Sequence, residues 1–405
     1  MTAATPQATA MPYRSIGING WRPLDIELVE LCAELGFNDL QITFVGSHFD
    51  LYLDFRARAK ETGIFDLGKR YGMTTSMWIR EFYHENCRWG LPEIENQLYW
   101  EGLRRRYAGL VELFPEADNF VLTLVESDKW VAACSPPVIA RAVTAIHEAL
   151  RAAGKGLILR TFTWHRELAL NVGEAIADLP EEILISTKCV GNDWNYRQSH
   201  HPLIGSVAGR KQVVEMNLFG TWQREHYVAN GLADEIARRF EFWQAQGVQG
   251  IFVPPDGRTR QSRPIGNAQE GNLWVIGRLA AGERDLDQIW RDFAAHRFGK
   301  RAADAMAEAL RPTGEVVSEA LHVDREYFAH PSGSIPALRM MAEQGKARLM
   351  SDEEAEWVPE DLEKFDLQRN PFAINFSTWR WDPSYIPTYH QIRKGAPEII
   401  ADKLQ

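Results

Sequence analysis

The sequence has few of the features that mark secreted, membrane or zinc-binding proteins. Its four cysteines, Cys32, Cys87, Cys134 and Cys189, form no C-x-x-C pair, which argues against a disulfide framework or a zinc cluster. No apolar run reaches the roughly 18 residues of a membrane span. The opening residues, MTAATPQATAMPY, lack the basic and apolar segments of a signal peptide. We therefore expect a soluble, cytoplasmic protein with no membrane partner.

Positive charge and several catalytic motifs are also scarce. The net charge is −10, which disfavours a nucleic acid as partner, although a local basic pocket for an acidic ligand is compatible with it. The chain has no G-x-S-x-G elbow, no H-x-H and no H-E-x-x-H spacing. His165, His200 and His201 follow predicted strands and are expected near the same end of the fold, but they lack the spacing of a metal site. We expect neither a metal ion nor another cofactor.

What the sequence does contain is a regular alternation of short apolar runs and amphipathic segments. Eight such alternations in about 270 residues predict a (β/α)8 TIM barrel. A doubly wound open sheet is the alternative, but the first predicted strand is not followed by a glycine-rich phosphate fingerprint. The predicted strands are 14–19, 38–44, 73–81, 117–127, 156–164, 181–188, 212–220 and 248–256, and the predicted helices are 25–37, a segment ending near 71, 95–115, 136–154, 166–178, 232–247 and 271–282.

The domain organisation follows from the same pattern. Residues 1–11 are small and polar and predict a flexible tail, whereas 12–284 contain the barrel. From 285 to 405 the pattern is mostly helical and shows no strands, which predicts a C-terminal helical extension packed on the barrel.

Polar side chains recur where the predicted strands end, and the carboxyl ends of the strands carry the chemistry in this fold. Cations and carboxylates repeated on successive strands would suit an acidic sugar. Any single one of them can instead form a structural ion pair at the rim, and most of the 14 tryptophans are expected in the core. The strand-end residues are Asn19, Trp21, Thr43, Arg80, Glu81, Glu126, Arg160, Trp164, Lys188, Asp193, Asn217 and Asp256.

Two carboxylates are candidates for acid–base chemistry. Glu126 follows the apolar run FVLTLV, where partial desolvation would raise its pKa and suit a general acid. Asp193 follows Gly191 and Asn192, and a sharp loop there could direct it inward to activate water. The alternatives are an ion pair of Glu126 with Lys129 or a barrel arginine, and a turn in which Asp193 binds its own backbone.

The candidate substrate-binding residues are cations and aromatic side chains. Arg160 and Lys188 end neighbouring strands and could hold a uronate carboxylate, or they could neutralise Glu126 and Asp193. Tryptophan offers a flat apolar platform for a sugar ring. The complete set is Arg160, Lys188, Trp164, Trp21, Asn217, Arg80 and Trp194.

Four blocks of the chain resemble the xylan α-1,2-glucuronidases, glycoside hydrolase family 67. They are RSIGINGWRPLDIELVELCAELGF (14–37), LRTFTW (159–164), TKCVGNDWNYRQSHHPLIG (187–205) and QVVEMNL (212–218). The resemblance implies an inverting barrel hydrolase that removes α-linked glucuronic acid from oligosaccharides, and it implies a homodimer. It also implies that Glu126 is the acid, that Arg160 and Lys188 hold the carboxylate, and that Asp193 positions water.

The sequence departs from that family at a second water-positioning glutamate. Thr221 occupies its place, and Glu225, four residues later, is the candidate substitute. The barrel is predicted to begin near residue 12, so we expect no counterpart of the family's separate N-terminal domain. Together these differences suggest a remote relative of the family, whose substrate need not derive from xylan. Two other classes stay open. One is a uronate lyase or isomerase, and the other is a non-catalytic protein that binds sugar acids.

Overall fold

The computed structural model describes most of the chain, and the statements below concern those residues. They are 10–43, 45, 49–81, 94–124, 134–162, 166–189, 200–201, 203–207, 209–217, 229–254, 264–266, 270–321, 374–375 and 378–379.

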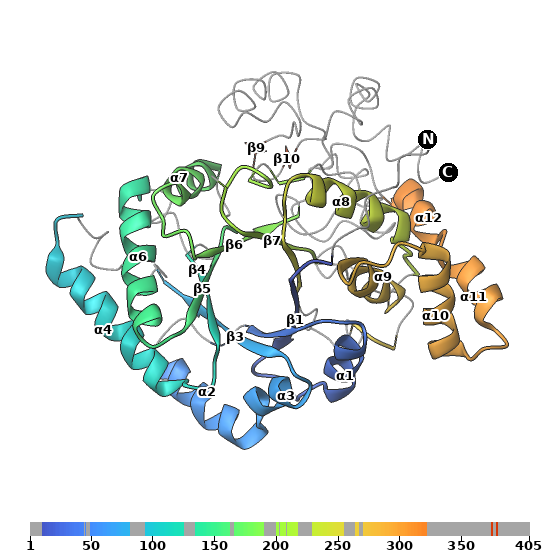
Figure 1. Cartoon of the computed structure of the whole chain (residues 1–405), viewed down its shortest axis with the longest axis horizontal. Coiled ribbons are helices and arrows are strands. Elements are labelled where there is room, and N and C mark those ends of the chain that lie inside the picture. The colour runs from blue at the N-terminus through green and yellow to red at the C-terminus, as the bar shows by residue number, and fades with distance from the viewer. Residues whose placement is uncertain are drawn as a thin grey trace, which may run out of the picture.

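Eight parallel strands form a closed barrel in sequence order, which confirms the predicted (β/α)8 fold (Figure 1). The barrel closes where Tyr13 to Ile16 of the first strand pair with Gly250 to Val253 of the last. The strands are β1 (Tyr13–Asn19), β2 (Asp39–Thr43), β3 (Thr74–Arg80), β4 (Asn119–Thr123), β5 (Gly156–Arg160), β6 (Leu184–Lys188), β7 (Gln212–Glu215) and β8 (Gly250–Val253).

Alternation along each strand divides the apolar side chains between two cores. Trp78, Val121, Ile158 and Phe252 form a small cluster of their own inside the barrel. Their neighbours in sequence belong to the large cluster between the strands and the helices. A residue's position in the alternation therefore decides whether its side chain faces the barrel interior or the helices.

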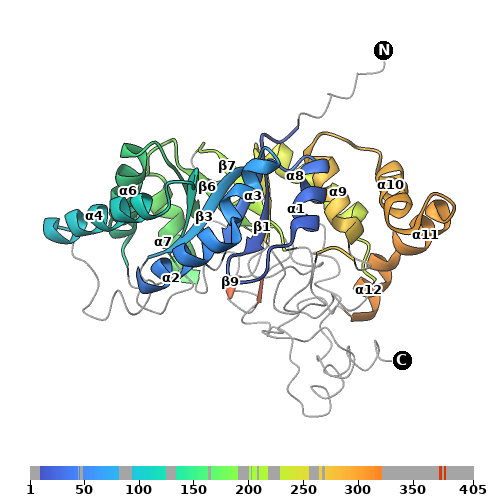
Figure 2. The ribbon, with the colours of Figure 1, turned by 90° about the horizontal axis from the view of Figure 1, so that it is seen from below.

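Helices surround the strands and run back to the amino end of the barrel (Figures 1 and 2). Asp25 and Asn96 cap two of them by accepting hydrogen bonds from the backbone N–H groups of Leu28 and Tyr99, as polar N-cap residues do. The helices are α1 (Ile26–Glu34), α2 (Phe49–Thr62), α3 (Ile64–Arg70), α4 (Gln97–Leu113), α6 (Pro136–Ala152), α7 (Arg166–Ile176), α8 (Ala233–Ala245) and α9 (Glu270–Ala280).

Two connections differ from the regular pattern. The segment between β2 and β3 contains two helices instead of the one predicted, and Gly63, with φ of +67°, separates them. Between β6 and β7, the described residues 200–201, 203–207 and 209–211 form turns and bends without a helix.

The helical extension begins with three helices beside α8 and α9, visible in orange in Figure 1. They are α10 (Leu286–Phe298), α11 (Ala303–Leu310) and α12 (Thr313–Leu321). Farther along, β9 (Ile374–Asn375) and β10 (Thr378–Trp379) form an antiparallel pair. This pair was not predicted, because two-residue strands are too short to show a period.

Candidate functional site

The inner faces of the strands change from apolar to polar as the barrel approaches its carboxyl end. On five strands, β3 to β7, an inward-facing polar side chain comes two residues after an inward-facing apolar one, as strand alternation places them on the same face. In chain order, the apolar residue and the polar residue that follows it are Trp78 and Arg80, Val121 and Thr123, Ile158 and Arg160, Leu184 and Ser186, and Val213 and Glu215. This polar level, continued by Lys188 on β6, is the candidate active site.

A buried ion pair lies at the centre of this level. Arg160 of β5 donates from Nε and Nη2 to the two carboxylate oxygens of Glu215 of β7, at 2.5 and 2.6 Å. Both side chains are at least 96% buried, and two parallel hydrogen bonds fix their relative orientation. The guanidinium group also lies over the rings of Trp78 and Phe162, with its carbon 4.4 and 4.9 Å from their centroids.

A second cation lies beside the pair. Lys188 is 7% exposed, and its Nζ is 4.0 Å from the centroid of the Phe162 ring. The ring therefore contacts two cations, an arrangement that the quadrupole of an aromatic ring favours. With Arg160 and Lys188 charged and Glu215 ionised, the three side chains carry a net charge of +1.

The neighbouring charges determine whether Glu215 is ionised. Burial alone would raise its pKa, but the charge and hydrogen bonds of Arg160, and then the charge of Lys188, outweigh burial and lower the pKa below its usual value. Glu215 is thus held as a carboxylate.

His201 is also close to this level, because its backbone N–H donates to the carbonyl of Cys189, next to Lys188. Its Nδ1 accepts a hydrogen bond of 3.1 Å from the backbone N–H of Leu203, which places the proton on Nε2 of the neutral ring. Burial and then the charge of Lys188 lower its pKa to about 3. His201 is therefore a neutral imidazole at physiological pH.

Below the polar level, a chain of hydrogen bonds holds Trp78 in place. Its Nε1 donates to Gln41 (2.8 Å), Gln41 donates to the hydroxyl of Tyr13 (3.1 Å), and Tyr13 donates to Asp39 (2.7 Å). Asp39 accepts further hydrogen bonds from the hydroxyls of Ser15, Thr74 and Ser76. This network closes the amino end of the barrel.

The structure separates two neighbours that both end strand three in the sequence. Arg80 has the parity of the interior residues, whereas Glu81 is 1% exposed and accepts hydrogen bonds from Arg106 and Tyr107 of α4. The prediction that Glu81 is a strand-end site residue is therefore wrong. Alternation directs it toward the helices, where it forms a structural network.

Of the predicted substrate-binding residues, Arg160 and Lys188 lie together. Arg80 is at the same register level, two strands from Arg160. Trp21 is 39% exposed and donates from Nε1 to the carbonyl of Val45, and Asn217 is half-buried just after β7. The remaining predicted site residues lie outside the described residues, namely Glu126, Trp164, Asp193, Trp194 and Glu225.

Four members of the site were missed, although the sequence carries a signal for them. Thr123, Phe162, Ser186 and Glu215 share the inward parity of Val121, Ile158, Leu184 and Val213. Reading every second residue of strands four to seven would have identified them. The partner of Glu215 is not predictable in this way, because its pairing with Arg160 across 55 residues leaves no local pattern.

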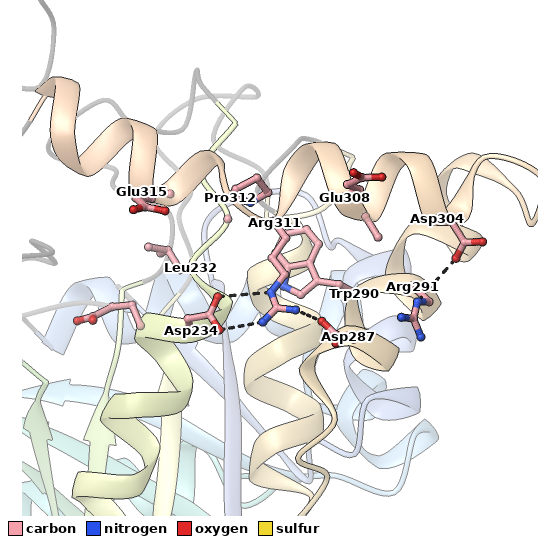
Figure 3. Close-up of a pocket in the computed structure, with 14 residues that line it drawn as sticks. Leu232, Asp234, Asp287, Trp290, Arg291, Asp304, Glu308, Arg311, Pro312 and Glu315 are labelled. Atoms are coloured by element: carbon pink, nitrogen blue, oxygen red, sulfur yellow. Dashed lines mark hydrogen bonds and ion pairs between the residues drawn. The ribbon is translucent and has the colours of Figure 1, made fainter.

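A separate cavity of about 770 Å³ lies outside the barrel, between the start of α8 and helices α10–α12. Figure 3 shows its charged groups pairing with one another: Arg311 binds both Asp234 and Asp287, and Arg291 lies 3.7 Å from Asp304. The pair of Arg311 with Asp234 of α8 connects the extension to the barrel, whereas the other two pairs lie within the extension. We therefore interpret the cavity as a structural junction.

Neither metal ligation nor membrane insertion is suggested by the described part of the chain. It contains no group of three or more histidine, cysteine, aspartate or glutamate side chains placed to hold a metal ion. None of its helices combines the length and apolarity needed to cross a membrane. Cys32, Cys134 and Cys189 are buried free thiols.

Comparisons with known proteins give distant similarities only. The chain matches no family model and no curated protein sequence. Among solved structures, a glycoside hydrolase family 20 β-N-acetylglucosaminidase is 12% identical with a TM-score of 0.47, covering 75% of this chain and 76% of that one. The family 30 subfamily 8 xylanase Xyn30A from Clostridium acetobutylicum is 10% identical with a TM-score of 0.44, covering 68% and 72%.

A third solved structure has a different activity. It is a truncated 3-deoxy-D-arabino-heptulosonate 7-phosphate synthase from Thermotoga maritima, 12% identical with a TM-score of 0.38, covering 71% of this chain and 87% of that one. These similarities are too distant to bear on the reaction.

Proposed function

We propose that the chain is a glycoside hydrolase that removes an α-linked uronic acid from an oligosaccharide with inversion. The observation that carries the proposal is the buried cluster of Arg160, Lys188 and Glu215, with its net positive charge. It lies at the carboxyl end of the barrel, where enzymes of this fold bind their substrates. A positive charge in a partly desolvated site favours a sugar carboxylate over a neutral hydroxyl.

We assign different roles to the two cations. Glu215 already occupies Nε and Nη2 of Arg160, so we assign the direct charge contact with the substrate carboxylate to Lys188. Arg160 then supplies a fixed positive potential, held by Glu215 and by the rings of Trp78 and Phe162. The exposed indole of Trp21 is a candidate platform for the sugar ring.

The bond-breaking roles in this proposal come from the sequence. Glu126 donates a proton to the glycosidic oxygen, and Asp193, assisted by Glu225, activates the attacking water. Inversion requires the acid and base carboxyl groups to be about 6.5–9.5 Å apart, so that a water molecule fits between the base and the sugar.

The proposal is tested with an oligosaccharide that carries a terminal α-linked glucuronic acid, and with its glucose counterpart. We expect Lys188→Met to lower kcat/KM for the acidic substrate about 10- to 100-fold, which is the range for losing a hydrogen bond to a charged group. Activity on the neutral substrate should change little. Lys155→Met is the matched control, because Lys155 lies at the amino end of β5 and donates to the carbonyl of Pro115.

The products distinguish the remaining classes. Proton NMR of a fresh reaction should show the β-anomer of the released uronic acid first, as inversion requires. An unsaturated product that absorbs in the near ultraviolet would show a lyase instead. Tight binding of glucuronate without turnover of any uronide would show a binding protein.

A further inference from the structure

Two buried hydroxyl groups flank Arg160 and make no hydrogen bond within the protein. They are Oγ1 of Thr123 and Oγ of Ser186, each on a residue that is 1% exposed. The strand register places them on either side of the arginine, since Thr123 of β4 pairs with Arg160 of β5, which pairs with Ser186 of β6. Three adjacent strands thus present a hydroxyl, a guanidinium and a hydroxyl at one level.

Both hydroxyls face the barrel interior, in line with the polar level of the candidate site. Thr123 follows Val121 by two residues, and Ser186 follows Leu184 by two, and both of these apolar residues belong to the interior cluster or pack against it. The polar groups therefore share the space into which Arg160 projects.

The missing hydrogen bonds are unusual for this barrel. Toward the amino end of the barrel, the hydroxyls of Ser15, Thr74 and Ser76 all donate to Asp39 at 2.6 to 2.8 Å. Within the described part of the chain, Thr123 and Ser186 carry the only buried hydroxyls without a partner. A buried hydroxyl left without a hydrogen bond costs free energy, and such a group calls for an explanation.

We infer that Thr123 and Ser186 are substrate-binding residues, whose hydroxyls complete their hydrogen bonds to oxygen atoms of the bound sugar acid beside Arg160. A hydroxyl can donate to a carboxylate oxygen or accept from a sugar hydroxyl, so the pair suits a ligand that is rich in oxygen and negatively charged. The inference rests on the proposed function and adds two contacts to the carboxylate-binding group. Free energy lost in the unliganded protein is recovered when the ligand binds.

The test compares variants that remove a hydroxyl while keeping the shape of the side chain. Thr123→Val and Ser186→Ala should each raise the melting temperature by about 1–3 °C, because an unsatisfied buried group is removed. Each should also weaken binding of free glucuronate about tenfold, as measured by calorimetry, which is a typical effect of losing a hydrogen bond to a charged group. Glucose serves as the neutral probe.

Thr187→Val is the matched control on the same strand as Ser186. Thr187 is also fully buried, but its hydroxyl accepts hydrogen bonds from Thr161 at 3.1 Å and from Gln212 at 3.0 Å. Its removal should lower the melting temperature and leave the Kd for glucuronate within about twofold of wild type, since alternation points it away from the interior. Thr123→Ser keeps a hydroxyl and should bind like wild type.

The outcomes separate this inference from the proposed function. If wild type binds glucuronate and Thr123→Val and Ser186→Ala bind it equally well, the hydroxyls are not ligand contacts and the inference is overturned while the proposed function stands. If wild type binds no sugar acid at all, the proposed function fails and the inference fails with it. A higher melting temperature together with weaker binding, restored by Thr123→Ser, supports the inference.

Discussion

At the scale of single residues, the pairing of Arg160 with Glu215 is the dominant feature of the site. Each partner alone would be a buried charge with a large desolvation cost, and together they satisfy one another through two hydrogen bonds. Such a pair contributes little net stability over an apolar pair of similar size, but breaking it is costly. In this site the pair fixes the Arg160 guanidinium in one orientation.

Glu215→Gln should lower the free energy of unfolding by about 3–5 kcal/mol, because it leaves the Arg160 charge buried without its counter-charge. The double variant Arg160→Met with Glu215→Leu should cost clearly less, because it buries no charge. Urea unfolding of the two variants and wild type measures both values. Equal losses in the single and double variants would show that the charge pair is not what the single change disrupts.

The same pair makes the stability of the folded protein depend on pH. The lowered pKa of Glu215 stabilises the folded state fully above the pKa of an unfolded glutamate, and this contribution is lost as the pH falls through the folded value. The difference in stability between wild type and Glu215→Gln should therefore shrink as the solution becomes acidic.

At the scale of elements, the connection between β2 and β3 depends on one backbone conformation. Gly63 adopts a left-handed φ of +67° between α2 and α3, and only glycine takes up this region without a steric cost. The break lets two helices cover this side of the barrel at different angles, which a single continuous helix could not do.

Gly63→Ala should lower the free energy of unfolding by about 1 kcal/mol through the strained φ. Gly102→Ala is the control, because Gly102 lies in the middle of α4 with nothing within 4 Å of an added Cβ. There the same substitution should stabilise by up to about 1 kcal/mol through helix propensity. Thermal unfolding of both variants measures whether each substitution raises or lowers stability. A stabilising effect of Gly63→Ala would contradict this account.

The sequence predicts strands and helices well where their patterns are local. All eight barrel strands lie at the predicted positions, because each buried parallel strand is a short apolar run between polar segments. The division of α2 from α3 was missed, since a glycine in a helical pattern does not show the sign of its φ. The helices α10 to α12 fall in the segment that was predicted to be helical.

The candidate site is predictable only in part. Arg160 and Lys188 could be identified because charged residues that end apolar strands are conspicuous. Their partners could not, because the contact between Arg160 and Glu215 depends on β5 and β7 being brought together by barrel closure. Glu81 shows the converse error, since a strand-end position alone does not tell which face its side chain occupies.

At the scale of the whole molecule, the extension joins the barrel through a close backbone contact. A Cβ added at Gly231 would lie 2.5 Å from the carbonyl oxygens of Leu310 and Arg311, and the Gly231 N–H donates to the hydroxyl of Thr313 at 2.9 Å. Arg311 adds ion pairs to Asp234 of α8 and Asp287 of α10 (Figure 3).

Gly231→Ala should therefore push α11 and α12 away from α8 and lower the free energy of unfolding by about 1–3 kcal/mol, as overpacking does. Limited proteolysis should cleave the chain within residues 299–313 faster than in wild type. Gly109→Ala, in an open position on α4, is the control that should leave cleavage unchanged. Unaltered cleavage in Gly231→Ala would show that the contact does not hold the extension in place.

The network around Asp39 determines where a ligand can enter and leave the barrel. Hydroxyls directed at one buried carboxylate close the amino end, and the rings of Trp78 and Phe252 fill the interior above it. A ligand in the polar level must therefore leave through the opening by which it arrived. The interior is therefore reached from one end only. If the proposed function holds, a released sugar acid and the next substrate molecule must use the same opening.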